Sequence, residues 1–377
     1  MATLTLSPDV LEWAANKVGL SLTELAGKVA PPSKTEAVLQ GKVTPTQIEK
    51  IASISRIPFG FLFLEAPPTI DRPQLPDLRQ LKDAEPLSED FYETLSDVLR
   101  KQEWFADYLQ DGESEGPAFV GRYADRSDPE LVPIVAKEIT ETLSLTRNDR
   151  RNSATPEAFY SLLVGRLEAS GVLVFKNGVV KSNTRRPLSA SEFRGFAIVD
   201  SLAPAIFVNG ADWPTAWVFT LIHEAAHIWL GHSGVSNVSA STMTVSDASV
   251  ETLCNRIAAE VLTPHAEFLA AWSALDASHF IVLSRRFRVS QLVIARRALE
   301  FGLITAAQYG AAAEASRKAA NRTTSGGDGF ANILIRNSKR LTKAVVARAM
   351  AGDLMLRDAG GLLNASPRSV VELARRG

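Results

Sequence analysis

Residues 1–64 carry short runs of apolar residues at helical spacing, separated by helix breakers. One run begins after Ser21, whose hydroxyl stands three residues before Glu24, and this spacing predicts a capping box. Pro31-Pro32 ends that helix, and Ser33 is a candidate cap for the next one, predicted from Lys34 to Gln40. About five small helices in about 60 residues is the layout of a helix-turn-helix domain.

The helix predicted at 34–40 would be the recognition helix of such a domain. It offers Lys34, Thr35 and Gln40 for contact with bases or phosphates. The same pattern also fits a degenerate helical module that is used for dimerisation or for binding a partner. The sequence therefore leaves both roles open for residues 1–64.

A different pattern follows in residues 65–117. Five prolines stand between Leu64 and Glu89, which predicts a stiff, extended linker. An amphipathic helix is then expected from Phe91 to Leu109, before a Gly-rich and acidic break at 111–117.

Strand signals appear only in the third segment, which we expect to form a domain from 118 to 277. After two helices, short runs rich in β-branched and aromatic residues predict a small, mostly antiparallel sheet. The last of these strands, Pro204 to Asn209, would hold an extended peptide if it lay at the sheet edge. Asp212 is the expected cap of the following helix, and another helix is expected from Val250 to Leu262. The predicted strands are 171–176, 193–199 and 204–209. The fold class is thus mainly α with a small β-sheet, an α+β architecture.

The last segment, 278–377, reads as a basic helical region. From Arg285 onward there are 17 Lys and Arg against 6 Asp and Glu, although the whole chain carries a net charge of only −1. Ser325 to Gly329 predicts a break between its helices. Such a region can bind nucleic acid or an acidic partner, or it can simply cover the central domain.

Composition narrows the class of protein. One Cys in 377 residues excludes an internal disulfide, and the N-terminus lacks the features of a secretory signal, so we expect a cytoplasmic protein. No run of about 18 apolar residues lacks a charge, which argues against a membrane-spanning helix.

The strongest chemical signal is the motif His-Glu-Ala-Ala-His at 223–227. His223 and His227 are four residues apart, so both imidazoles lie on one helical face and can bind one metal ion. Glu224 is rotated away from that line and can act on a water molecule at the metal. The leading interpretation is therefore a zinc hydrolase in which Glu224 is the general base.

A catalytic zinc ion usually has three protein ligands. Glu251, on the next predicted helix, is the preferred third ligand. Glu260 lies about 13.5 Å further along that helix and could not reach the same ion together with Glu251. His232 and His265 remain alternatives, whereas Cys254 is expected to be a small core residue.

Three stretches resemble the ImmA/IrrE family of zinc metallopeptidases. The resemblance implies that His223, His227 and Glu251 bind Zn²⁺ and that Glu224 is the base. It also implies a repressor-like protein substrate, whose cleavage induces phage, mobile-element or stress genes. The stretches are Phe193-Arg194-Gly195-Phe196, the segment from Phe219 to His227, and the segment from Glu251 to Pro264.

Residues 1–64 resemble the XRE-type helix-turn-helix domain that is fused ahead of this peptidase in many bacterial and phage proteins. Phe59 to Leu64, followed by prolines, is typical of that fusion. Such fusions also resemble antitoxins encoded beside a toxin, for example a PIN-type ribonuclease. The alternative function is therefore a DNA-binding regulator or antitoxin in which the peptidase fold serves as a scaffold for a partner. Such a regulator could bind DNA as a homodimer.

Overall fold

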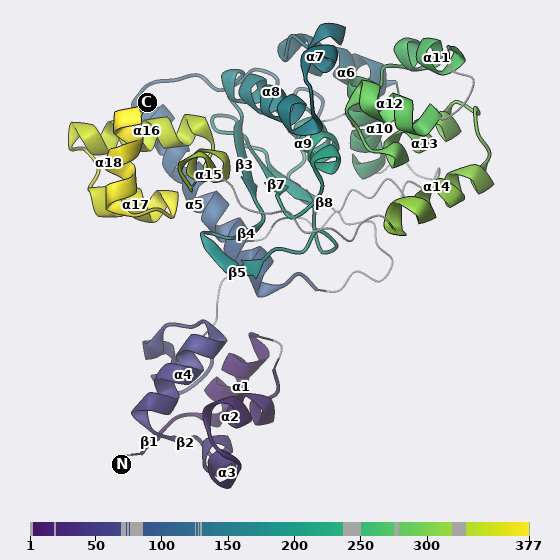
Figure 1. The fold of residues 1–377 in the computed structure, drawn as a ribbon. Helices are drawn as coiled ribbons and strands as arrows, with labels where there is room; N and C mark the ends of the chain where they lie inside the picture. Colours follow the sequence, from purple (N-terminus) through teal and green to yellow (C-terminus); the bar gives the residue numbers. More distant parts are fainter. Residues whose placement is uncertain are drawn as a thin grey trace. The chain divides into compact units, whose positions relative to one another are not determined.

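A computed structural model of the chain describes residues 3–18, 20–68, 73, 75, 86–124, 126, 128, 130–236, 250–274, 279–318 and 329–376. These residues belong to two compact units, Met1–Pro73 and Gln74–Gly377 (Figure 1). Most of the predicted linker between Leu64 and Glu89, and most of the predicted break at 325–329, lies outside the described residues. Each unit is considered separately below.

The N-terminal unit is a small helical cluster with one short antiparallel strand pair. The predicted capping box is present, because Ser21 Oγ accepts a hydrogen bond from Glu24 N and Glu24 caps Ser21 N in return. A second capping box joins Thr44 and Gln47. The elements are β1 (Leu4–Thr5), α1 (Pro8–Asn16), α2 (Leu22–Val29), η1 (Pro32–Lys34), α3 (Thr35–Leu39), β2 (Lys42–Val43), α4 (Pro45–Ser55) and η2 (Phe59–Phe63).

The expected recognition helix is shorter than predicted. Instead of one helix from Lys34 to Gln40, a 3₁₀ turn is followed by the five residues of α3. Ser33 lies inside the 3₁₀ turn and is not a helix cap, so that prediction was wrong. The two prolines explain the difference, because their fixed φ angles suit a tight turn and each lacks a backbone N–H.

The larger unit is built around a four-stranded mixed sheet with strand order β3-β7-β6-β8. The strands are β3 (Leu173–Asn177), β6 (Gly195–Ile198), β7 (Ala205–Asn209) and β8 (Gly234–Ser236). β3 and β7 are parallel, whereas β6 is antiparallel to both β7 and β8. The condition under which the strand at 204–209 could hold an extended peptide is not met, because β7 is paired on both sides. Within the described residues the edges are β3 and β8.

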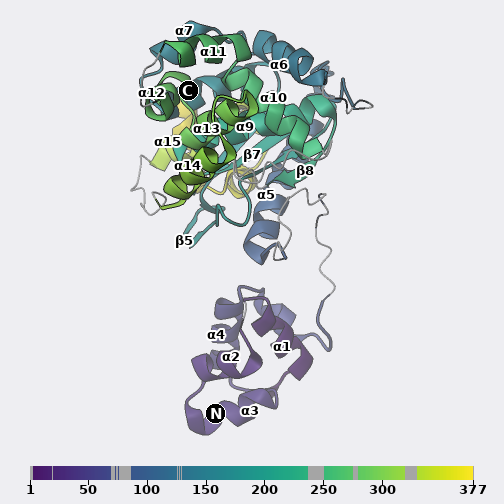
Figure 2. The ribbon, with the colours of Figure 1, turned by 90° about the vertical axis from the view of Figure 1, so that its right-hand side faces the viewer.

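Both faces of this sheet are covered by helices, which explains why its central strands are apolar throughout. One face packs against α9 (Pro214–Leu230), and α10 (Val250–Leu262) packs on α9 in turn. The other face packs against α5 (Glu89–Asp111) and against helices from the C-terminal end of the chain. Figure 1 shows these two helical layers on either side of the strands, and Figure 2 looks onto the layer that contains α9 and α10.

The remaining elements complete a mainly helical unit, so the predicted fold class is confirmed. Among the described residues, no helix is long and apolar enough to cross a membrane. These elements are α6 (Leu131–Thr142), α7 (Arg147–Asn152), α8 (Pro156–Ala169), β4 (Val179–Val180), β5 (Asn183–Pro187), α11 (His265–Ser273), α12 (His279–Phe287), α13 (Gln291–Glu300), α14 (Ala306–Lys318), α15 (Gly329–Arg336), α16 (Lys339–Ala351), α17 (Leu356–Leu363) and α18 (Pro367–Arg376).

β6 approaches α9 most closely at Gly195, the glycine of the Phe-Arg-Gly-Phe stretch. A Cβ atom built there would lie 2.7 Å from Thr220 Cγ2, 2.8 Å from Glu224 Oε1 and 2.9 Å from Phe207 O. One of these contacts is with backbone, which cannot rotate away. Gly195 is therefore required for the spacing between the sheet and α9.

We predict that Gly195→Ala lowers the stability of the larger unit by about 1–3 kcal/mol, the usual cost of overpacking a core. The added methyl group must push β6 or α9 aside. The matched control is Gly165→Ala, in the middle of α8, where nothing lies within 4 Å of an added Cβ. That control should be neutral or slightly stabilising, because alanine is the better helix former. Urea unfolding of both variants measures the difference, and equal midpoints would refute the proposed close packing.

Candidate metal centre

α9 carries the His-Glu-Ala-Ala-His motif in its buried second half. His223 and His227 are both fully buried, and their Nε2 atoms lie 3.1 Å apart. The i to i+4 spacing on one helical face brings the two rings together, as the sequence predicts. The two Nε2 atoms therefore lie close enough together to bind one metal ion.

Asp212 is not the cap of α9, and that prediction was wrong. The N-cap position belongs to Trp213, which makes no side-chain cap. Asp212 instead accepts a hydrogen bond from Trp213 N at 2.8 Å and pairs with Arg194 at 3.3 Å. Asp212 stands one residue before the N-cap position. Its carboxylate instead links the loop before α9 to Arg194, which directly precedes β6.

Glu251 joins the two histidines from α10. Its Oε1 atom lies 2.9 Å from His227 Nε2, and its Oε2 atom lies 3.2 Å from His223 Nε2. The three side chains offer ligand atoms that all lie within 4.8 Å of one another, and all three are buried. The three residues predicted as metal ligands are therefore brought together by the packing of α10 on α9.

The competing carboxylate has another partner. Glu260 forms an ion pair with Arg297 of α13, and it also accepts a hydrogen bond from His265 N. Glu260 lies more than two helical turns beyond Glu251. Its carboxylate joins α10 to α13 through Arg297. It does not belong to the cluster around His223.

The other candidate ligands also lie elsewhere. His232 follows the end of α9 and hydrogen-bonds through its backbone to His227 O. His265 is exposed and packs its ring against Phe301, with 4.5 Å between ring centroids. Cys254 is fully buried in the apolar core, and burial raises the pKa of its thiol well above the usual range. A neutral thiol in apolar surroundings fits the predicted core role.

Glu224 is held by a residue that the sequence reading missed. Ser236 Oγ, on the edge strand β8, donates a short hydrogen bond to Glu224 Oε1. Glu224 Oε2 is also buried, and it has no hydrogen-bond partner among the described residues. The signal was hard to see, because Ser236 stands at the end of a three-residue strand in a Ser-rich stretch.

Burial and mutual charge set the protonation of these groups. Burial raises the pKa of Glu224 to about 8. Burial alone would also raise the pKa of Glu251, but the neighbouring histidines outweigh it and lower that pKa to about 2. The pKa of His223 is raised, because the Glu251 carboxylate outweighs the effect of burial, whereas burial lowers the pKa of His227. The cluster thus favours a charged Glu251 and a neutral His227, the forms that bind a cation, whereas His223 would have to lose a proton to bind one.

The donor set fits a zinc ion. Two imidazole nitrogens and one carboxylate are the ligands of a common class of catalytic zinc sites. The Nδ1 atoms of His223 and His227 are buried and make no hydrogen bond among the described residues, whereas both Nε2 atoms face the Glu251 carboxylate in the cluster. When bound, zinc would lower the pKa of a water molecule and polarise a carbonyl group. Glu224 follows His223 directly in the chain. Ser236 fixes its Oε1 atom, and its Oε2 atom is available to accept a proton.

The three residues predicted to contact DNA lie on or beside α3 in the N-terminal unit. Lys34 and Gln40 are exposed and Thr35 is half-buried. Thr35 Oγ1 donates to Pro31 O, and Gln40 Nε2 donates to Glu36 Oε1. Lys34 is thus the one cation among the three, and their role in DNA binding stays a prediction.

Comparison with known proteins bears on two regions of the chain. Residues 167–299 match the Peptidase_M78 family model, described as the IrrE N-terminal-like domain. Residues 337–376 match a second family model, described as a domain of unknown function. No curated protein and no solved structure matches the chain significantly.

The first match runs from the end of α8 through α13 and includes every residue of the candidate metal centre. It agrees with the resemblance seen in the sequence and with a metallopeptidase type of site. Residues 167–299 are therefore similar to the IrrE N-terminal-like domain, and this match supports the resemblance of the chain to the ImmA/IrrE family.

Proposed function

We propose that this chain is a zinc-dependent endopeptidase that cleaves a repressor-like regulator and so controls transcription. The proposal depends mainly on one observation, the convergence of His223, His227 and Glu251 near Glu224, whose carboxylate is held by Ser236. The family match adds the peptidase type of hydrolase. The regulator as substrate comes from the family resemblance alone.

The residues of the site suggest how a peptide bond would be attacked. Glu224 would take the proton of the attacking water and return it to the leaving amine. Ser236 would keep Glu224 in place through Oε1 and leave Oε2 to hold that water. An extended peptide paired with the edge of β8 that is unpaired among the described residues would pass next to Glu224, since Ser236 is part of that strand.

We predict that Glu224→Gln retains zinc and loses peptide cleavage by a factor of about 10² or more, because only the proton acceptor is removed. Metal content and cleavage of the regulator encoded nearest to the gene are the two measurements. Equal cleavage by the variant and the parent would sink the assigned role. Glu260→Gln, a carboxylate outside the cluster, is the matched control and should cleave like the parent.

We further predict that Glu251→Ala lowers zinc occupancy well below one ion per chain, because one of three protein ligands is lost. Metal analysis after dialysis against a weak chelator measures the loss. An unchanged zinc content would mean that the ion is held elsewhere. No zinc in the parent protein, even after zinc is offered, would favour the alternative function, a regulator or antitoxin that uses the fold as a scaffold for a toxin.

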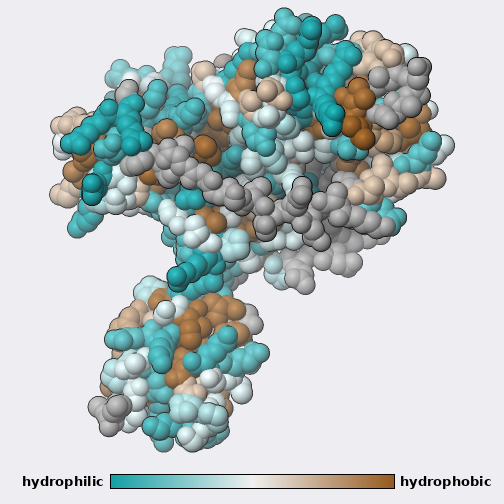
Figure 3. Space-filling view, in the orientation of Figure 1, coloured by the Kyte–Doolittle hydropathy of each residue, from teal (hydrophilic) through white to brown (hydrophobic). Residues whose placement is uncertain are grey.

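For the N-terminal unit we propose binding to DNA through α3. Lys34 is exposed and stands at the start of that helix, where it can reach a phosphate group. The unit also carries an apolar surface area (Figure 3), and Phe59, Phe63 and Leu64 are among its exposed large apolar residues. That area suits contact with a protein and is the observation that favours a partner-binding role for the same unit.

Binding of the full chain to its own promoter separates these roles. We predict that Lys34→Ala weakens binding at every sequence tested and lowers the slope of log affinity against log salt by about 1, as expected for a lost phosphate contact. Lys50→Ala, an exposed lysine on α4, is the matched control and should leave the slope unchanged. If the parent shifts no promoter fragment even at low salt, the partner-binding role is favoured.

A further inference from the structure

A small polar cavity lies between α5, the β3–β5 segment and the C-terminal helices. Its volume is about 20 Å³, and its lining includes Lys101 of α5, Lys181 between β4 and β5, and Arg336 at the end of α15. Phe207 also lines it, so it stands against β7 of the central sheet. The cavity is separate from the metal centre. It accommodates one or two water molecules, or one small anion if the flexible side chains at its rim move slightly.

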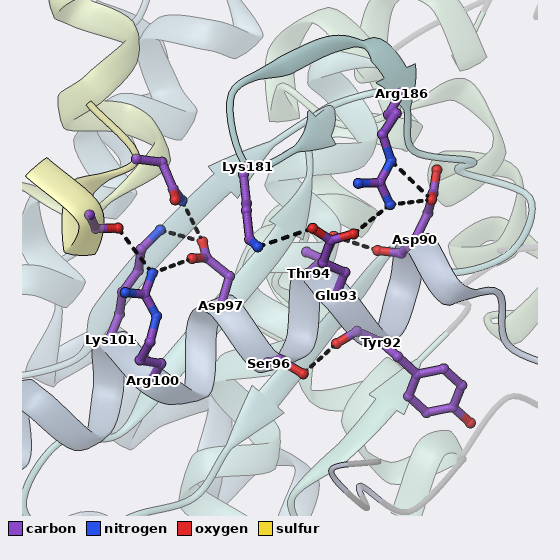
Figure 4. Close-up of polar contacts among 12 residues, drawn as sticks. Asp90, Tyr92, Glu93, Thr94, Ser96, Asp97, Arg100, Lys101, Lys181 and Arg186 are labelled. Atoms are coloured by element: carbon purple, nitrogen blue, oxygen red, sulfur yellow. Dashed lines mark hydrogen bonds and ion pairs between the residues drawn. The ribbon is translucent and has the colours of Figure 1, made fainter. Parts of the chain in front are cut away.

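The charges around the cavity are unevenly balanced (Figure 4). Asp97 is the one carboxylate of the lining, and it is already fully used: it accepts from Arg100 at 2.7 Å, Lys101 at 2.5 Å and Asn364 at 2.8 Å. Outside the lining, Lys181 pairs with Glu93 at 3.0 Å, and Arg186 pairs with both Glu93 and Asp90 at 2.6 Å, so these two cations and two carboxylates balance one another. The lining therefore holds three cations and one anion.

The charged forms of two of these cations, Lys101 and Arg336, are destabilised by burial. Burial lowers the pKa of Lys101, and the nearby positive charges of Arg100 and Lys181 oppose the stabilising effect of Asp97. Arg336 is half-buried and has no counter-ion among the described residues, and burial lowers its pKa as well. An anion in the cavity would relieve both costs, and a guanidinium group suits the oxygens of a phosphate.

One acceptor in the lining limits which anion fits. Asn337 is buried, and its Nδ2 atom donates to Ile333 O and Leu363 O, which fixes the orientation of the amide. Its Oδ1 atom is left buried without a hydrogen-bond partner. An anion that also carries an O–H group would satisfy this acceptor, whereas a fully deprotonated oxyanion would leave it unpaired.

We propose that this cavity is a binding site for inorganic hydrogen phosphate, held by Lys101, Lys181 and Arg336 and donating a hydrogen bond to Asn337. The small volume favours the free ion over a larger phosphate ester. The four residues come from α5, from the turn between β4 and β5, and from the end of α15 and the residue after it, so the bound ion would fasten the C-terminal helices to the core. Residues 337–376 match a family of unknown function, and nothing in that match assigns this site.

Calorimetric titration of the full chain at pH 7 and constant ionic strength tests the proposal. Phosphate should bind saturably at about one ion per chain, and sulfate should bind at least about 10-fold more weakly, because it lacks the O–H group that Asn337 accepts. Absence of saturable phosphate binding would show that the cavity holds only water. Equal affinity for sulfate would overturn the role of Asn337. If glycerol phosphate bound more tightly than inorganic phosphate, the site would still bind a phosphate group, but the proposed free ion would be wrong and the ligand would be a phosphate ester.

The variants separate this site from adventitious binding at the surface. Arg336→Gln and Lys181→Gln should each weaken phosphate binding about 10-fold, the effect of one lost charged hydrogen bond. Arg357→Gln is the matched control, since Arg357 is 83% exposed and lies on α17 outside the lining. The same affinity in Arg336→Gln and in the parent would refute the site. Both variants alter partly exposed side chains, so they leave the buried Lys101–Asp97 pair intact.

Discussion

The close packing of α10 on α9 is the constraint on which the candidate metal centre depends. His223 and His227 come together through helical spacing alone, but the carboxylate predicted as the third ligand joins them only because Glu251 faces them across the contact between the two helices. Ala258 and Ala259 are small and buried along α10, and they allow the helices to approach. A buried carboxylate would be strongly destabilising without a partner. The two imidazoles are that partner, and in return the carboxylate completes a site for a cation.

The central sheet connects the α9–α10 pair to the rest of the larger unit, because helices pack on both of its faces. Its strands are buried on both faces, by α9 on one side and by α5 with the C-terminal helices on the other. Gly195 sets the distance on the α9 side, where a larger residue would collide with Glu224. On the opposite side the apolar contacts surround a polar cavity. The C-terminal helices thus complete the core, although their basic composition alone was also compatible with a separate binding region.

The sequence predicted the parts of the structure that follow from local spacing. The motif at 223–227 has strict helical spacing, and Glu251 was found because it is a carboxylate near the start of the next predicted helix. Topology was less accessible: nothing in the composition of residues 204–209 shows that β7 pairs on both sides, since apolar edge and central strands look alike. Ser236 was missed because a three-residue strand has no measurable period. Asp212 failed as a cap because the distant Arg194, which no local pattern could reveal, holds its carboxylate.

The two oxygens of Glu224 show how a buried carboxylate can be kept ready for proton transfer. Burial favours its neutral form, and the hydrogen bond from Ser236 favours the charged form, so the two effects oppose each other. A base whose pKa lies near neutrality accepts and releases a proton at similar cost, which is the condition for efficient general base catalysis. Because Ser236 fixes only Oε1, the second oxygen keeps its acceptor capacity. The edge strand therefore both orients Glu224 and leaves one of its oxygens able to accept a hydrogen bond, as the proposed role of a general base requires.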